Sequence, residues 1–143
     1  MNYFQTPLFM NISEDEYKDM MSKNFTKKKE YNKSSFIFHA DDIISEIGLV
    51  MYGHVLIQHT DFNGNEIIIS HIDAGQIFAE SYALCKEPLM VSAVAADYTK
   101  VLFVDTNMFT DESNIRYSWY PKMLSNLLKI SAGKNLALSN RIF

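Results

Sequence analysis

Hydrophobic and polar residues change their spacing twice along the chain, which divides it into three parts. In the first part, Ser13 and Glu16 stand three residues apart, which is the spacing of a helix capping box. Tyr17, Met20 and Met21 then recur at helical intervals and make one apolar face. This pattern predicts a short N-terminal helix.

The second part, residues 27–105, consists of short runs rich in β-branched and aromatic residues, separated by turn residues. The runs are residues 35–39, 47–52, 55–60, 66–72, 90–96 and 100–104. Asn63 and Gly64 lie between two of them, and this pair tolerates the positive φ angles of a tight hairpin. Many short strands at regular spacing are typical of antiparallel sandwiches and barrels, so we predict a mainly β roll.

The third part, residues 117–143, predicts one long helix. Pro121 is tolerated only in a first helical turn, so the helix should start near Trp119 or Tyr120. Its apolar side chains cover more of the circumference than one contact surface requires. They are Leu124, Leu127, Leu128, Ile130, Leu136, Leu138 and Ile142. We therefore expect the helix to contact the roll on one side and a second copy of itself on another. A helix packed wholly into its own core is the alternative.

The composition indicates one soluble globular domain. The chain has 143 residues, of which 48% are hydrophobic and 21% are charged, and this length is enough for one core. Its single cysteine, Cys85, cannot form an internal disulfide. The sequence shows neither a secretion-signal pattern nor the roughly 20-residue apolar run of a membrane-spanning helix. These observations favour a cytoplasmic protein that makes no contact with a membrane.

The charge of the chain argues against nucleic-acid binding by this chain alone. The net charge is −4, whereas such binding depends on Lys and Arg side chains that neutralise phosphates. The one basic run, Lys27 to Lys29, is followed by Glu30 and stands where a first strand should begin. Lysines at a solvated strand edge discourage unwanted pairing, which is the role we expect for this run. Any contact with DNA must then come from another part of the protein.

Three segments resemble, in their order along the chain, the phosphate-binding cassette of the catabolite-activator/Fnr (Crp/Fnr) family of bacterial transcription regulators. They are GQIFAES at residues 75–81, VSAVAA at residues 91–96 and KVLFV at residues 100–104. Residues 38–42, 48–55 and 64–65 look like strand, glycine and hairpin signatures of the same domain, and residues 126–129 and 134–136 look like its dimerisation helix. The resemblance implies an antiparallel jelly roll like that of cyclic-nucleotide-binding domains, a homodimer, and a C-terminal winged helix-turn-helix that binds DNA.

The resemblance also divides the chain. It implies an effector-sensing roll with its N-terminal helix at residues 1–116 and a dimerisation helix at residues 117–143. The helix reaches residue 143 without a cap or stop signal, so we expect that the DNA-binding domain belongs to a longer protein and is missing from this chain. A natural chain without that domain is the alternative. The expected dimer interface consists of Leu124, Leu128, Asn135, Leu138 and Ile142.

The resemblance implies a binding pocket for a small-molecule effector, with one residue that departs from the family pattern. Family members that bind cyclic nucleotides use a helix N-terminus and a Glu for the ribose and phosphate, and an Arg to neutralise the phosphate. Here Glu80 occupies the Glu position, but Val91 occupies the Arg position. A phosphodiester would then be an unpaired charge, so we expect that cAMP is not the effector. The candidate pocket residues are Ala79, Glu80, Ser81, Val91, Ser92 and Ser139.

Two residues near the pocket keep alternative interpretations. Glu80 either holds a ligand or caps backbone amides at a helix start, where the helix dipole favours a carboxylate. Lys86 either replaces the missing cation or is a solvated lysine in a turn. The pocket itself accepts another small molecule or has lost ligand control.

Other functions have weaker support in the sequence. A cupin-type metalloenzyme would share the roll, but His39, His54, His59 and His71 do not have the cupin spacing of two histidines separated by one residue with a Glu shortly after. One cysteine cannot hold an iron-sulfur cluster, and no catalytic grouping is recognisable. We therefore expect no catalytic residue, no metal site and no cofactor. A stand-alone ligand-binding or dimerisation module is the alternative to a regulator.

Overall fold

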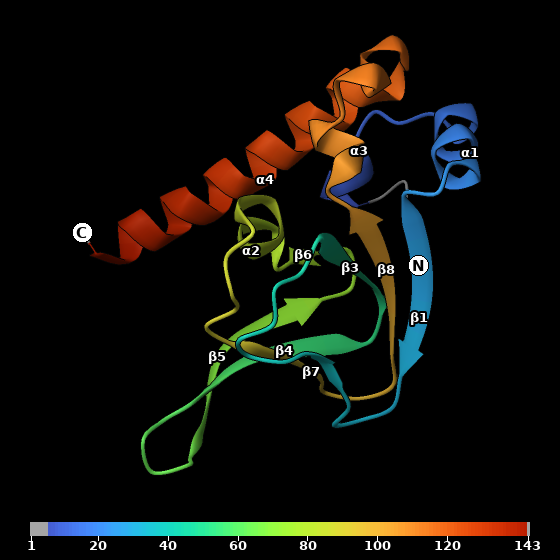
Figure 1. The fold of residues 1–143 in the computed structure, drawn as a ribbon. Coiled ribbons are helices and arrows are strands. Elements are labelled where there is room, and N and C mark those ends of the chain that lie inside the picture. The colour runs from blue at the N-terminus through green and yellow to red at the C-terminus, as the bar shows by residue number, and fades with distance from the viewer. Residues whose placement is uncertain (1–5, 143) are drawn as a thin grey trace.

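The structure is a computed structural model that describes residues 6–142, apart from the side chain of Ile142. Figure 1 shows a β roll with helices gathered at one end and a long C-terminal helix that runs across that end. One hydrophobic cluster lies between these helices and the roll, and a second cluster lies inside the roll around Phe78 and Phe103. The elements outside the sheets are η2 (Pro7–Phe9), α1 (Glu14–Ser22), α2 (Glu80–Cys85), α3 (Asn107–Thr110), η3 (Glu112–Arg116) and α4 (Trp119–Ile142).

The roll consists of two four-stranded antiparallel sheets. One has the order β1 (Thr26–Tyr31), β8 (Thr99–Asp105), β3 (Glu46–Tyr52) and β6 (Ile77–Phe78). The other has the order β2 (Phe36–Phe38), β7 (Ser92–Ala95), β4 (His54–Thr60) and β5 (Glu66–Asp73). The predicted mainly β roll is confirmed, and each predicted run contains a strand. β1 is an edge strand with its three lysines exposed, as expected.

The predicted capping box starts α1. The Ser13 side chain accepts a hydrogen bond from the Glu16 amide at 3.1 Å, and the Glu16 carboxylate accepts one from the Ser13 amide at 3.0 Å. The adjacent Asp19 accepts a hydrogen bond from the indole nitrogen of Trp119 at 2.9 Å. The N-terminal helix is therefore attached to the first turn of α4.

Helix α4 begins at Trp119 with Pro121 in its first turn, as predicted. Its first half packs against the roll and η2 through the buried side chains of Trp119, Met123 and Leu127. Beyond Ile130 the helix leaves the core, and most of its side chains are exposed. The alternative of a helix packed wholly into its own core is therefore wrong.

At Gly53 and Gly64, two glycines with positive φ angles, an added methyl group should lower the free energy of unfolding by different amounts. Gly64, in the β4–β5 hairpin, has φ +81° and no atom within 4 Å of the position that a Cβ would take. Gly53, between β3 and β4, has φ +86°, and its Cβ would lie 2.4 Å from the Tyr98 carbonyl oxygen. Gly64→Ala should cost only backbone strain, about 1 kcal/mol, whereas Gly53→Ala adds a backbone clash and should cost about 2 kcal/mol. Urea unfolding measures both losses, and equal losses would contradict the packing argument.

Candidate effector pocket

The pocket forms where the chain passes from β6 into α2. Ala79 adopts a left-handed conformation with φ 66°, which turns the chain from the strand into the helix. Glu80 is therefore the first residue of α2, and only 7% of its side chain is exposed. The buried side chain of Ala83 packs α2 against the roll. The helix ends at Lys86, which adopts a second left-handed conformation.

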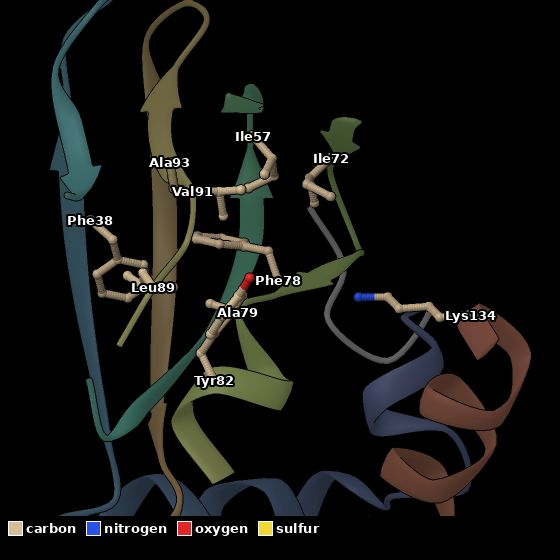
Figure 2. Close-up of a pocket in the computed structure, with 10 residues that line it drawn as sticks. All are labelled: Phe38, Ile57, Ile72, Phe78, Ala79, Tyr82, Leu89, Val91, Ala93 and Lys134. Carbon is tan, nitrogen blue, oxygen red and sulfur yellow. The ribbon is translucent and has the colours of Figure 1, made fainter. Parts of the chain in front are cut away.

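A cavity of about 130 Å³ lies beside α2 (Figure 2). Its walls come from strands of both sheets, from α2, from the loop before β7 and from one side chain of α4. Three aromatic rings and several aliphatic side chains make the walls mainly apolar, and the Tyr82 hydroxyl and the Lys134 amine point toward the space. The lining residues are Phe38, Ile57, Ile72, Phe78, Ala79, Tyr82, Leu89, Val91, Ala93 and Lys134.

Glu80 forms an ion pair with Lys134, which comes from α4. The Lys134 ammonium also donates a hydrogen bond to the Ile77 carbonyl oxygen at 2.9 Å. The lysine side chain is 45% exposed, so it stands at the edge of the cavity with its amine turned inward. The pair connects the long helix to the start of α2.

The structure brings together only some of the predicted pocket residues. Ala79 and Val91 line the cavity. Ser92 lies beside it in β7, where its hydroxyl accepts a hydrogen bond from the Ala40 amide at 2.9 Å. Ser81 is exposed on α2, and Ser139 is half-buried near the end of α4. These three serines are not among the described lining residues, and neither is Glu80, which contacts the cavity only through its ion pair with Lys134.

The cation that pairs with Glu80 is Lys134, whereas the sequence suggested Lys86. Lys86 donates a hydrogen bond to the Thr106 hydroxyl at 3.3 Å and is not among the residues that line the cavity. Lys134 is 54 residues from Glu80, and sequence reasoning missed it because helical spacing shows which face a residue occupies but not what that face contacts. The pocket-lining Phe38 does lie within a segment that resembles the family, so part of the lining had a signal.

Histidine and carboxylate side chains meet at one corner of the roll. His54 Nδ1 lies 3.1 Å from an Asp97 carboxylate oxygen, and His54 Nε2 lies 3.8 Å from Asp73. The hydrogen bond from His54 lowers the pKa of the Asp97 carboxyl more than partial desolvation raises it. Within residues 6–142, no group of three or more His, Cys, Asp or Glu side chains could hold a metal ion. Over the same range, no helix is long and apolar enough to cross a membrane.

Comparison with known families identifies the class of domain. A sequence profile described as "Cyclic nucleotide-binding domain" matches residues 28–113, which is more than half of the chain. The chain therefore belongs to the cyclic-nucleotide-binding domain family. A comparison with curated protein sequences gives no match.

Solved structures share the fold. The catabolite activator protein of Thermus thermophilus is 23% identical, with a TM-score of 0.79 over 96% of this chain and 62% of that protein. A cyclic nucleotide-binding domain from Methylobacillus flagellatus is 19% identical, with a TM-score of 0.78 over 94% of this chain and 74% of that chain. The N-terminal domain of a transcriptional regulator from Streptomyces coelicolor is 17% identical, with a TM-score of 0.71 over 97% of this chain and 93% of that chain.

These likenesses confirm the predicted resemblance to effector domains of the Crp/Fnr type. At such identities they show the fold, and the chain spans less than two thirds of the Thermus protein. The domain is thus a cyclic-nucleotide-binding fold whose cassette carries an apolar residue, Val91, on the cavity wall.

Proposed function

We propose that the chain is the effector-sensing and dimerisation part of a Crp/Fnr-type transcription regulator whose effector is not cAMP or cGMP. We assign residues 1–116 to the sensing unit, which is the roll with its N-terminal helix, and residues 117–143 to the dimerisation helix. The domain binds an effector in the cytoplasm and carries out no catalysis. Because the chain is acidic, we assign DNA recognition to another part of the regulator.

The ion pair between Glu80 and Lys134 is the observation that supports this proposal most strongly. Glu80 already binds Lys134, and Val91 contributes an apolar wall. A cyclic nucleotide would bring a phosphate charge to a cavity whose one described cation is paired, and an uncompensated buried charge is expensive.

Helix α4 gives the pocket a physical connection to a dimer. The same helix reaches the pocket through Lys134 and also carries the exposed leucines Leu128, Leu136 and Leu138. An effector that changes the contact of Lys134 would alter how α4 sits on the roll. The coupling is allosteric if the two positions of α4 differ in effector affinity.

Calorimetric titration with cAMP and cGMP tests the proposal. We expect no binding at ligand concentrations up to about 1 mM. A dissociation constant above about 1 mM corresponds to a binding free energy weaker than about −4 kcal/mol. If the missing cation is the cause, Val91→Arg should raise the affinity for cAMP at least about tenfold through a charge-assisted hydrogen bond. Micromolar binding of either nucleotide by the unaltered protein would disprove the proposal.

A further inference from the structure

We propose that the cavity beside α2 takes a compact neutral molecule with an apolar, benzene-sized body, and that it excludes anions of the same shape. This inference rests on the proposed function, because it names the ligand class of the same pocket. Three properties of the cavity support it: its size, the charge state of its rim and the position of its few polar groups.

The volume of the cavity suits a benzene-sized ligand. An engineered, enclosed apolar cavity of about 150 Å³ binds benzene, and the cavity here, which is partly open to solvent, has a similar volume of about 130 Å³. The rings of Phe38 and Phe78 stand on its walls with Ile57 and Leu89. A ligand whose apolar surface fits these walls removes both surfaces from water, which favours binding.

The charge at the rim selects a neutral ligand. Lys134 is the only charged residue among those described as lining the cavity, and it is paired with the nearly buried carboxylate of Glu80. The pair has no net charge. An anion that accepted the remaining N–H of Lys134 would place a second negative charge beside the nearly buried carboxylate of Glu80, and like charges in one such site repel each other. A neutral molecule leaves the pair intact.

The polar atoms of the cavity are hydrogen-bond donors. The Lys134 ammonium has three N–H groups, of which the Glu80 carboxylate and the Ile77 carbonyl accept two. The third N–H and the Tyr82 hydroxyl remain as donors for a neutral acceptor, such as a nitro or carbonyl oxygen. A ligand with one such acceptor would contact α4 directly through Lys134.

Nitrobenzene and benzoate make a matched pair of probes, because they have nearly the same shape and differ by one charge. NMR titration of the whole chain near neutral pH measures both affinities. We expect nitrobenzene to bind at least about tenfold more tightly than benzoate, since only benzoate would bring a negative charge close to the Glu80 carboxylate.

Three variants locate the binding and test the charge argument. Val91→Phe, from the half-buried loop before β7, and Ala93→Leu, from β7, each fill the cavity and should weaken nitrobenzene binding at least about tenfold. Circular dichroism and thermal unfolding identify whichever of the two remains folded. Glu80→Gln frees the Lys134 ammonium, so it should raise the affinity for benzoate at least about tenfold.

The outcomes separate this inference from the proposed function. The inference is overturned if benzoate binds as tightly as nitrobenzene, if neither probe binds, if a folded cavity-filling variant keeps full affinity, or if Glu80→Gln does not improve benzoate binding. None of these results involves cyclic nucleotides, so each leaves the proposed function standing. Micromolar cAMP binding, in contrast, would reject the proposed function whatever the two probes do.

Discussion

Leu138→Asp is expected to weaken self-association of the chain by about a hundredfold or more. Leu138 is 57% exposed in the single chain, on the half of α4 that has left the core. In a two-fold dimer the substitution places one carboxylate from each copy in an apolar seam, and burial of an unpaired charge costs several kcal/mol. Each 1.4 kcal/mol corresponds to a tenfold change in the dissociation constant.

The spacing of α4 residues supports one continuous seam. When Ser131 is added to the predicted interface, steps of four and three residues alternate along it, which is the heptad pattern of a coiled coil. Asn135 is a polar residue at such a position, and a single polar seam residue fixes the register of the two helices. The described positions in this series are Leu124, Leu128, Ser131, Asn135 and Leu138. Ile142 continues the spacing, but its side chain lies outside the described residues.

Leu136→Asp is the matched control. Leu136 is 62% exposed on the same half of α4, but it lies outside the heptad series. The same substitution there should leave the dimer almost unchanged. Sedimentation velocity at tens of micromolar protein compares the three chains. A monomeric unaltered chain, or equal losses in both variants, would show that this seam is wrong.

Glu16→Gln is expected to lower the free energy of unfolding by about 2–3 kcal/mol at neutral pH. Partial burial by itself would raise the pKa of Glu16. Hydrogen bonds from the Lys122 ammonium, the Ser13 amide and the Ser118 hydroxyl outweigh this effect, so the pKa falls from 4.5 to about 2. The Lys122 and Ser118 bonds are both 2.7 Å long and attach α1 to the first turn of α4 and to the residue before it. A shift of this size corresponds to about 3 kcal/mol, and water around Lys122 screens part of it.

The pH dependence of this loss has a definite sign. A carboxyl whose pKa is lowered on folding adds stability that is complete above its unfolded pKa and disappears as the pH falls through its folded pKa. The difference between the original chain and Glu16→Gln should therefore be constant above about pH 5 and vanish near pH 2. Urea unfolding at several pH values measures it. Glu14→Gln is the control, since the Glu14–Lys18 pair is 69% exposed on both sides and should contribute little.

Much of the fold could be predicted from local sequence. The capping box at Ser13 and the start of α4 near Pro121 follow from rules that span a single turn. The strands follow from runs of β-forming residues bounded by turns, and the hairpin follows from Asn63-Gly64. β6 was missed as a separate strand because two residues, Ile77 and Phe78, are too few to show a period.

The candidate site could be predicted only in part. Val91 and Ala79 were expected in the pocket because the cassette lies in one short segment that resembles a known family, and both line the cavity. Ser81, Ser92 and Ser139 were expected there too, yet they are not among its described lining residues. A hydroxyl group is a suitable side chain for a ligand pocket. Whether it points into the pocket depends, however, on the pairing and packing of the whole helix or strand.

The sequence by itself determined the first and last helices and most strands, because these depend on neighbours within a few residues, and its ordered motifs determined the family and the apolar residue at position 91. Tertiary structure alone decided the partner of Glu80, the size of the cavity and the half of α4 that stays exposed. Lys134 meets Glu80 across 54 residues only because α4 crosses the roll at one particular angle and position. That placement results from simultaneous packing of many side chains, which a pattern along one dimension does not contain.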